Sequence, residues 1–267
     1  MNKEQVLIEF SVSNCAAELS LNDIPLFHFK EGATRSRAAG PADPYLLRGL
    51  NRLSIVLAPG PTPTTSHQPG AWLQPEARVL ARVRRHRLDG QDMDDARPLA
   101  QLEWPRPGQP PVSRPGPVTD LSIDFTIDHP EPRSGWYWRR AKRPDNAQVG
   151  SVLRRLHADL SVGDTTSLMG LHQPKILDFC TAMGMDPAIH RQNLETSMRQ
   201  IVTAPDFRLW PTSQLKMAPR LIAGGQMMDL LCDDWLPPIR SGVPDTASWF
   251  TVRLRLGVLD GEVWILC

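Results

Sequence analysis

The stretch that most constrains the fold is residues 249–267, WFTVRLRLGVLDGEVWILC. Apolar and polar residues alternate along its first half, which predicts a β-strand with one apolar face and an opposite face that carries Arg253 and Arg255. Asp260-Gly261 supplies two residues that tolerate positive φ, so the chain should turn there and return as a second strand. A lone hairpin is only marginally stable in water, so another part of the chain must cover the apolar face.

The bulk properties of the chain are those of a soluble globular protein with a sizeable core. It has 267 residues, of which 41% are hydrophobic and 22% charged, enough for one large or two ordinary domains. The formal net charge is +1, and no apolar run approaches the roughly 20 residues that span a bilayer, so neither nucleic acid nor a membrane is an expected partner. The first residues, MNKEQVLIEFSVSN, alternate like a strand and do not resemble a signal peptide, which favours a cytoplasmic protein.

The chain lacks the usual signatures of cofactor and nucleophile chemistry. It contains no P-loop, no glycine-rich dinucleotide turn, no GxSxG and no HExxH. We therefore expect no cofactor and no metal. Its four cysteines are far apart with no CxxC pair, which favours buried thiols in a reducing compartment over a zinc site or a disulfide. These cysteines are Cys15, Cys180, Cys232 and Cys267.

Short alternating segments separated by proline-rich loops fill the N-terminal half. Turn residues such as Asn22-Asp23 recur about every ten positions. This pattern predicts an antiparallel β-sandwich of jelly-roll or immunoglobulin-like style over residues 1–135, followed by a linker over residues 136–144. The expected strands lie within residues 4–12, 17–29, 45–57, 77–88, 99–104 and 121–127.

Trp136-Tyr137-Trp138 closes this region and is followed by basic residues. An aromatic platform beside positive charge suits a glycan or a nucleic-acid base, and Trp72, Trp136 and Trp138 would then be the stacking residues. The simpler interpretation is a strand end whose aromatic side chains seal a seam between two domains. Trp136 and Trp138 share a face at the strand period, which favours this second interpretation.

Helical periodicity begins after residue 144. Asp145 can cap a first helix, which ends before Gly163, and Pro174 should kink or split a second helical region. Asp186 followed by Pro187 should open a third helix. The inward positions of the third helix are expected at Ile189, Leu194, Met198, Ile201 and Val202.

Strand patterns return after the helices and lead into the final hairpin. A helix that ends in LSVGD (160–164), then further helices, strands and a long terminal hairpin resemble the NTF2-like, or cystatin-like cone, superfamily. The resemblance implies an α+β cone over residues 145–267, in which long strands wrap around the helices and a pocket opens at the wide end. The strand candidates before the hairpin are residues 207–210, 216–218, 220–223 and 226–231.

The resemblance also indicates where catalysis would take place. A His–Asp pair near the mouth of such a cone can act as a general base and its orienting group, so His157 and Asp164 are the residues to test if the protein is an enzyme. The simpler interpretation is a histidine favoured by the C-terminus of a helix, with Asp164 capping the next helix. On that interpretation the chain has no catalytic residue.

Charged clusters also allow two interpretations each. Asp229, Asp233 and Asp234 supply oxygen ligands for a divalent cation, but their spacing is not that of a calcium loop, so a solvated cluster or an acidic patch facing a basic partner is simpler. Arg253 and Arg255 suit carboxylate recognition, or they lie at an interface or in surface salt bridges. The basic run RVRRHR is followed at once by four aspartates that can neutralise it.

These features favour a non-enzymatic binding protein, with another protein as its partner. Loop-rich sandwiches joined to small α+β domains look like bacterial accessory or immunity proteins that neutralise a cognate toxin. An NTF2-like enzyme or small-ligand binder that uses the cone pocket, and glycan binding by the sandwich, are the alternatives. A homodimer through the C-terminal sheet is a further expectation. The binding candidates are Arg253, Arg255, Trp136, Trp138, Asp233 and Asp234.

Overall fold

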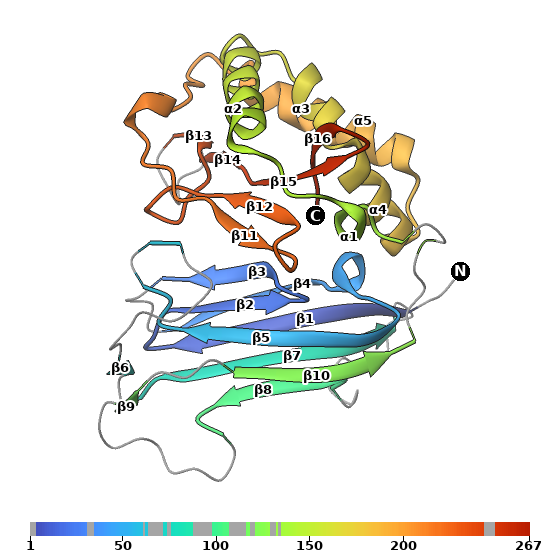
Figure 1. Ribbon diagram of the computed structural model, residues 1–267, viewed down its shortest axis with the longest axis vertical. Coiled ribbons are helices and arrows are strands. Elements are labelled where there is room, and N and C mark those ends of the chain that lie inside the picture. The colour runs from blue at the N-terminus through green and yellow to red at the C-terminus, as the bar shows by residue number, and fades with distance from the viewer. Residues whose placement is uncertain are drawn as a thin grey trace. The chain divides into compact units, whose positions relative to one another are not determined.

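The chain forms two compact units, Met1–Gly60 with Thr64–Glu131 and Pro61–Pro63 with Pro132–Cys267. The first consists of antiparallel sheets, and the second of helices followed by an antiparallel sheet, so the expected α+β class is confirmed (Figure 1). None of the helices in the described residues has both the length and the apolar character needed to cross a bilayer. The computed structural model describes residues 4–30, 35–60, 62–63, 72–73, 76–87, 98–106, 116–117, 121–128, 132, 135–242 and 249–267.

Two four-stranded antiparallel sheets make up most of the N-terminal unit. The first has the order β4 (Ser36–Pro41), β1 (Glu4–Ser13), β7 (Arg78–Arg87) and β8 (Ala100–Trp104). The second has the order β10 (Leu121–Ile127), β5 (Gly49–Leu57), β2 (Ala17–Leu21) and β3 (Ile24–Phe29). The short strands β6 (Trp72–Leu73) and β9 (Gly116–Pro117) pair with each other, and a 3-10 turn η1 (Asp43–Tyr45) precedes β5.

Alternating side chains build the core between these two sheets. Val6, Ile8, Phe10 and Val12 of β1 are buried at every second position, as the strand period requires. One continuous cluster joins them to the buried residues of β2, β5, β7 and β10. The predicted sandwich-like packing is therefore confirmed.

Both tight turns predicted from the sequence are present. Asn22 and Asp23, with φ of 53° and 61°, join β2 to β3. Asp260 and Gly261, with φ of 51° and 87°, join β15 (Leu254–Leu259) to β16 (Glu262–Ile265). Positive φ at both central positions gives the primed turn geometry that matches the twist of a hairpin, which explains the Asn, Asp and Gly residues.

The first long helix of the C-terminal unit, α2 (Asn146–Ser161), begins with a capping box. Asp145 Oδ1 accepts a hydrogen bond from the Gln148 N–H at 2.8 Å. In return, Gln148 Oε1 accepts one from the Asp145 N–H at 3.0 Å. Two amides without intrahelical partners are thereby satisfied, as the sequence indicated for Asp145.

The following helices also begin where their sequence signals lie. Pro174 occupies the first turn of α4 (Gln173–Met183), which is separated from α3 (Thr166–Leu171), so the second helical region is split. Asp186 accepts hydrogen bonds from the first turn of α5 (Pro187–Val202). Local sequence was sufficient for these helix starts.

A short helix, α1 (Tyr137–Arg140), replaces the strand end expected at Trp136-Tyr137-Trp138. The Tyr137 N–H donates a hydrogen bond to Asp178 Oδ2 at 2.8 Å, and the Trp138 N–H also bonds to this carboxyl. A buried aspartate of α4 therefore satisfies the first turn of α1. The strand expectation was wrong because the helix depends on a contact between residues about 40 positions apart, which the local sequence does not reveal.

The main C-terminal sheet has the antiparallel order β11 (Arg220–Ile222), β12 (Met227–Leu230), β15 and β16. A separate pair contains β13 (Ile239–Ser241) and β14 (Phe250–Val252). The long strand expected from Phe250 onward is thus broken at Arg253, because the residues before it pair with β13 and those after it pair with β12 and β16. A second 3-10 turn, η2, covers Thr212–Gln214.

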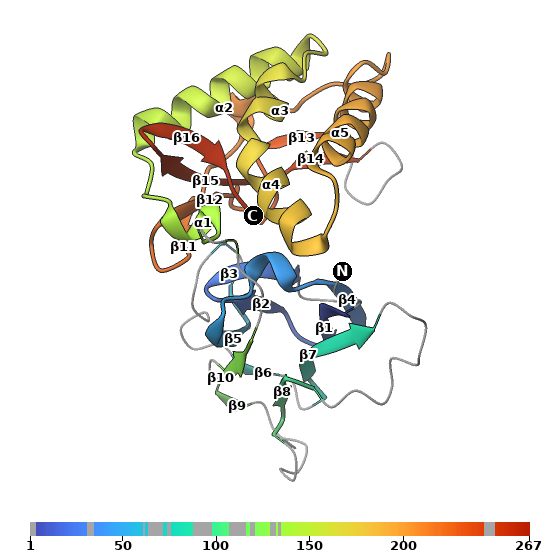
Figure 2. The ribbon, with the colours of Figure 1, turned by 90° about the vertical axis from the view of Figure 1, so that its right-hand side faces the viewer.

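Helices α2 and α3 cover one face of the main sheet (Figure 2). Leu156 and Leu160 of α2 and Leu168 of α3 are buried in one cluster with Leu254 and Leu256 of β15. The apolar face of the terminal hairpin therefore has the cover that its sequence required.

Helix α5 packs less deeply than expected. Val202 is buried, but Ile189 and Ile201 are 59% and 40% exposed, so the expectation that they point inward was wrong. The helix contacts α4 along a narrow stripe in which Leu194 and Met198 are half-buried. Apolar residues outside that stripe stay in solvent.

The remaining strand and cysteine expectations have mixed outcomes. The strands expected over residues 207–210 and 216–218 are reduced to single bridges, from Leu209 to Ser241 and from Met217 to Cys232. All four cysteines are buried free thiols, as predicted.

Candidate functional site

A row of charged side chains crosses the C-terminal sheet on the face opposite Leu254 and Leu256. Arg220 of β11, Asp229 of β12 and Arg255 of β15 are direct neighbours across adjacent strands. Asp229 is 0% exposed, and Arg220 and Arg255 are 6% and 3% exposed. The alternation in the sequence predicted an arginine face, but Arg255 is buried and does not lie on an open binding surface.

Three guanidinium groups share the carboxylate of Asp229. Its Oδ2 lies 3.1 Å from Arg220 Nη2 and 3.0 Å from Arg253 Nη2, and its Oδ1 lies 3.9 Å from Arg255 Nε. Burial favours the neutral carboxyl, but the charges of Arg253, Arg255 and Arg220 prevail and lower the pKa of Asp229 to about 2. The interpretation of Asp229 as part of a solvated cluster was therefore wrong.

The other two aspartates of the predicted cluster have separate surroundings. Asp234 Oδ2 pairs with Arg240 Nη1 at 2.7 Å, and its Oδ1 accepts a hydrogen bond from the Leu236 N–H. Asp233 is half-buried next to it, and its N–H donates to the Lys216 carbonyl oxygen. In the described part of the chain, no three His, Cys, Asp or Glu side chains converge as metal ligands do.

His157 and Asp164 have separate hydrogen-bond partners. His157 Nε2 lies 3.1 Å from the Trp210 carbonyl oxygen. Asp164 is exposed, and its Oδ1 accepts a hydrogen bond from the Thr166 N–H at the start of α3. Hydrogen bonds from the Thr166 side chain and from this N–H lower the pKa of Asp164. Each side chain therefore stabilises a helix end or a loop, and no hydrogen bond or ion pair between described residues joins the two.

The tryptophans proposed for stacking are not exposed. Trp136 and Trp138 are 0% and 4% exposed, so neither offers the open ring face that a glycan requires. The side chain of Trp72 lies outside the described residues. The structure thus gives no support to an aromatic platform at Trp136 and Trp138.

A partly enclosed cavity of about 290 Å3 lies between α3, α4, α5 and β14. This volume is close to the lower limit of typical ligand pockets, about 300 Å3. Two cationic side chains, Lys175 and Arg253, share its lining with His172, His190 and Thr251. We call this cavity the cationic pocket. Its apolar wall consists of Leu168, Met169, Ile176, Phe179, Leu194, Met198 and Val252.

Lys175 is the most unusual group of the cationic pocket. Its side-chain amine is partly buried and has no hydrogen-bond or ion-pair partner among the described residues. Burial, together with the charges of Arg255 and Arg253, lowers the pKa of Lys175 to about 8, although the charge of Cys267 acts in the opposite direction. The ammonium group still predominates at neutral pH, so the pocket contains a partly buried cation that forms no ion pair with any residue that the structure describes.

The second nitrogen group of the pocket, His172, is neutral at pH 7. Burial and the charge of Lys175 lower the pKa of His172 to about 4. Its Nδ1 lies 2.9 Å from the Leu168 carbonyl oxygen, so the neutral ring carries its hydrogen on Nδ1 and leaves Nε2 as an acceptor. His190 stacks on Phe179 with ring centroids 5.2 Å apart.

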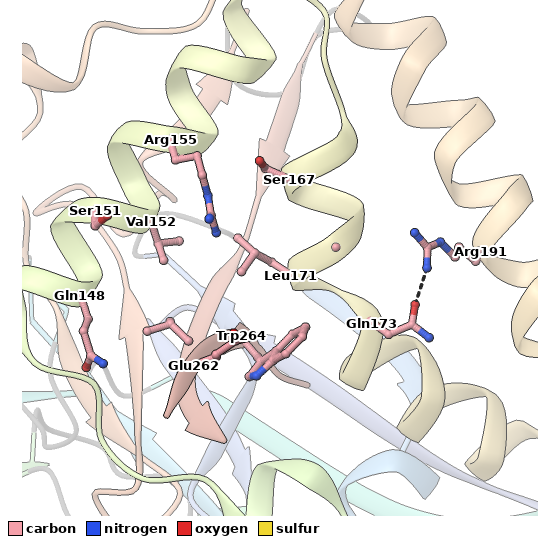
Figure 3. A pocket seen from close by; sticks show the side chains of 12 residues that line it. Gln148, Ser151, Val152, Arg155, Ser167, Leu171, Gln173, Arg191, Glu262 and Trp264 are labelled. Atoms are coloured by element: carbon pink, nitrogen blue, oxygen red, sulfur yellow. Dashed lines mark hydrogen bonds between the residues drawn. The ribbon is translucent and has the colours of Figure 1, made fainter. Parts of the chain in front are cut away.

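A larger and more open cavity, of about 630 Å3, lies between α2, α3, α4, α5 and β16 (Figure 3). Arg191 Nη1 donates a hydrogen bond to Gln173 Oε1 at 2.7 Å on one side. Figure 3 shows Arg155 extending from α2 into this space, with the Trp264 ring on the side of β16. We call this cavity the polar groove. Its polar lining comprises Gln148, Ser151, Arg155, Ser167, Gln173, Arg191 and Glu262.

Sequence reasoning indicated Arg253 but missed Lys175 and Trp264. Lys175 follows Pro174 in the first turn of an amphipathic helix, where a lysine is expected to be solvated. Only the packing of α4 against α5 and β14 encloses it.

No protein-family model, curated protein or solved structure matches this chain, so the arguments about its function rest on these two cavities.

Proposed function

We propose that the C-terminal unit binds a small organic carboxylate in the cationic pocket. Lys175 and Arg253 would bind the carboxylate, and the apolar wall would bind the rest of the molecule. The observation that carries the proposal is the partly buried Lys175 amine without an acidic partner among the described residues. A cation away from water that forms no hydrogen bond is unfavourable, so an anion bound beside it gains both attraction and charge-assisted hydrogen bonds.

Charge balance around Arg253 supports the same ligand class. Its guanidinium group shares Asp229 with Arg220 and Arg255, so this one carboxylate is divided among three arginines. Lys175 adds a fourth positive charge next to them. An incoming carboxylate would therefore meet a net positive field at one end of the pocket.

The size of the cationic pocket limits the ligand. Its volume of about 290 Å3 equals that of about ten water molecules at about 30 Å3 each. An aryl or alkyl carboxylate of about ten non-hydrogen atoms matches that volume and the mainly apolar wall. The compound 3-phenylpropionate is a suitable probe.

Calorimetric titration with three probes of one carbon skeleton tests the proposal. The probes are 3-phenylpropionate, its primary amide and 3-phenylpropylamine. We expect the carboxylate to bind at least about tenfold more tightly than the amide and the amine not to bind, because only the carboxylate gains a charge-assisted bond.

Two lysine variants locate the binding. Lys175→Gln should weaken binding of the carboxylate by about tenfold or more, whereas Lys142→Gln, at an exposed lysine outside the pocket, should leave it unchanged. Equal affinity for the acid and the amide, or equal effects of the two substitutions, would show that the pocket is not a carboxylate site.

A second proposal is the protein-binding function expected from the sequence, including neutralisation of a toxin. The observation that favours it is the polar groove, in which Trp264 and two arginines line an open space of about 630 Å3. Tryptophan and arginine are the residue types most enriched at energetic centres of protein interfaces. Arg155 lines the groove, whereas its exposed neighbour Arg154 does not. Substitution of Arg154 is therefore a matched control for substitution of Arg155.

Affinity capture with these variants tests the second proposal. A partner that survives a high-salt wash should be lost or reduced about tenfold with Trp264→Ala and Arg155→Ala and retained with Arg154→Ala. A partner retained equally by all three variants would place its binding surface elsewhere.

We also propose the NTF2-like cone as the finer fold of residues 145–267. The proposal is supported by the order of helices before an antiparallel sheet, and by a pocket that lies between helices and strands. The domain limits at residues 135 and 145, the cytoplasmic location and a homodimer through the C-terminal sheet remain predictions from the sequence.

A further inference from the structure

We propose that Lys175 is a reactive amine that forms an imine with the carbonyl group of a 2-oxo acid held in the cationic pocket. The inference rests on the proposed function, because the same pocket must first bind the carboxylate. It goes further by assigning a covalent step to one named atom, Lys175 Nζ.

The composition of the pocket supports this chemistry. Lys175 and Arg253 line the same cavity, and most of the remaining wall is apolar. In a 2-oxo acid the carbonyl carbon is bonded directly to the carboxylate carbon. A carboxylate that binds the planar fork of Arg253 would therefore bring the carbonyl carbon next to the neighbouring amine.

The protonation of Lys175 makes its amine available. Only the neutral amine is nucleophilic, and a lysine with an ordinary pKa near 10.5 is neutral in about one molecule in a thousand at pH 7.5. Burial and the charges of Arg255 and Arg253 lower the pKa of Lys175 to about 8. About a quarter of the molecules would then carry the neutral amine at pH 7.5. Desolvation beside other cations is a known way to activate a lysine.

The reaction needs no oxidant or reductant. The Nζ lone pair attacks the carbonyl carbon, the C–N bond forms, the C=O π bond breaks and one of the two amine protons moves to the carbonyl oxygen to give a carbinolamine. Loss of that hydroxyl group with a proton from nitrogen then gives the C=N bond and one molecule of water. The overall change is condensation of an amine and a ketone to an imine and water.

Reductive trapping on the full-length protein tests the inference. The protein is incubated with phenylpyruvate at pH 7.5, and cyanoborohydride then converts any imine to a stable secondary amine. Mass spectrometry of the peptides compares all five lysines, which are Lys3, Lys30, Lys142, Lys175 and Lys216. We expect the modification of Lys175 to exceed that of Lys142 by at least about tenfold, because the lowered pKa of Lys175 gives it a larger neutral fraction than an ordinary lysine has.

Two further readouts separate a pocket reaction from general lysine chemistry. Excess 3-phenylpropionate should suppress the modification of Lys175 and leave Lys142 unchanged. At phenylpyruvate concentrations well below saturation, where the rate reports the ligand-free protein, its midpoint against pH should lie near pH 8 for Lys175 and near pH 10 for an exposed lysine. Modification spread evenly over the lysines, or a midpoint near pH 10 for Lys175, would overturn the inference.

The two proposals fail in different ways. If 3-phenylpropionate binds tightly and loses affinity in Lys175→Gln, but phenylpyruvate gives no adduct at Lys175, the imine is overturned and carboxylate binding stands. If 3-phenylpropionate does not bind and Lys175 is not modified, both are overturned. Lys175→Arg keeps the positive charge without a primary amine, so it should bind 3-phenylpropionate and form no adduct.

Discussion

Asp229 is fully buried, and its carboxylate pairs with Arg220, Arg253 and Arg255. Asp229→Asn keeps the shape of the side chain but leaves these arginines without their shared counter-charge. We expect the free energy of unfolding of the C-terminal unit to fall by about 3–5 kcal/mol, the range for breaking a buried ion pair. Urea unfolding monitored by tryptophan fluorescence measures the change.

Asp233→Asn is the matched control for this residue-scale prediction, because Asp233 is half-buried and close in sequence. It should change the free energy of unfolding by less than about 0.5 kcal/mol.

The pKa of Asp229, about 2, is below its ordinary value of 3.8. The contribution of Asp229 to the free energy of unfolding is therefore present above pH 4 and is lost as pH falls through 2. Equal effects of the two substitutions would mean that the arginine cluster does not need Asp229.

At the scale of elements, Asp178 connects α4 to α1. Burial raises the pKa of Asp178 to about 7, although hydrogen bonds from the Tyr137 and Trp138 N–H groups and the charge of Arg140 act in the opposite direction. Because the folded protein then binds this proton more tightly than the unfolded chain, its stability should fall as pH rises from about 4 to 7. Urea unfolding midpoints at pH 5 and pH 8 measure this slope.

Substitution of Asp178 separates charge from hydrogen bonding. Asp178→Asn keeps an oxygen acceptor for the Tyr137 N–H, so it should flatten the slope between pH 5 and pH 8 and retain stability at pH 8. Asp178→Ala removes the acceptor as well, and should flatten the slope while lowering stability at both pH values by about 1–3 kcal/mol. An unchanged slope in Asp178→Asn would assign the pH dependence to another group.

Elements with local signals were predictable, and elements set by distant contacts were not. Asp145, Asp186 and the Asp260-Gly261 turn act within a few residues of themselves, and their helices and hairpin are present. The helix at Tyr137 depends on Asp178, and the break at Arg253 depends on pairing with β12 and β13. These contacts leave no periodic pattern in the sequence.

At the scale of the whole molecule, composition and strand period were sufficient for a two-part α+β protein with sandwich-like N-terminal sheets. The candidate site was not predictable in the same way. The cationic pocket collects residues from α3, α4, α5 and β14, which are spread over more than 80 positions from Leu168 to Arg253. Arg253 was identified because it lies on the polar face of an alternating strand, whereas Lys175 looked like any solvated lysine of a helix.

The central claim is that the cationic pocket binds an organic carboxylate, and a crystal structure of the protein grown with 3-phenylpropionate tests it most directly. The account predicts carboxylate oxygens within about 3.2 Å of Lys175 Nζ and of the Arg253 guanidinium group. The phenyl ring should lie against Ile176 and Phe179. A pocket that holds only water at a saturating concentration of the ligand, or 3-phenylpropionate bound elsewhere, would contradict the claim.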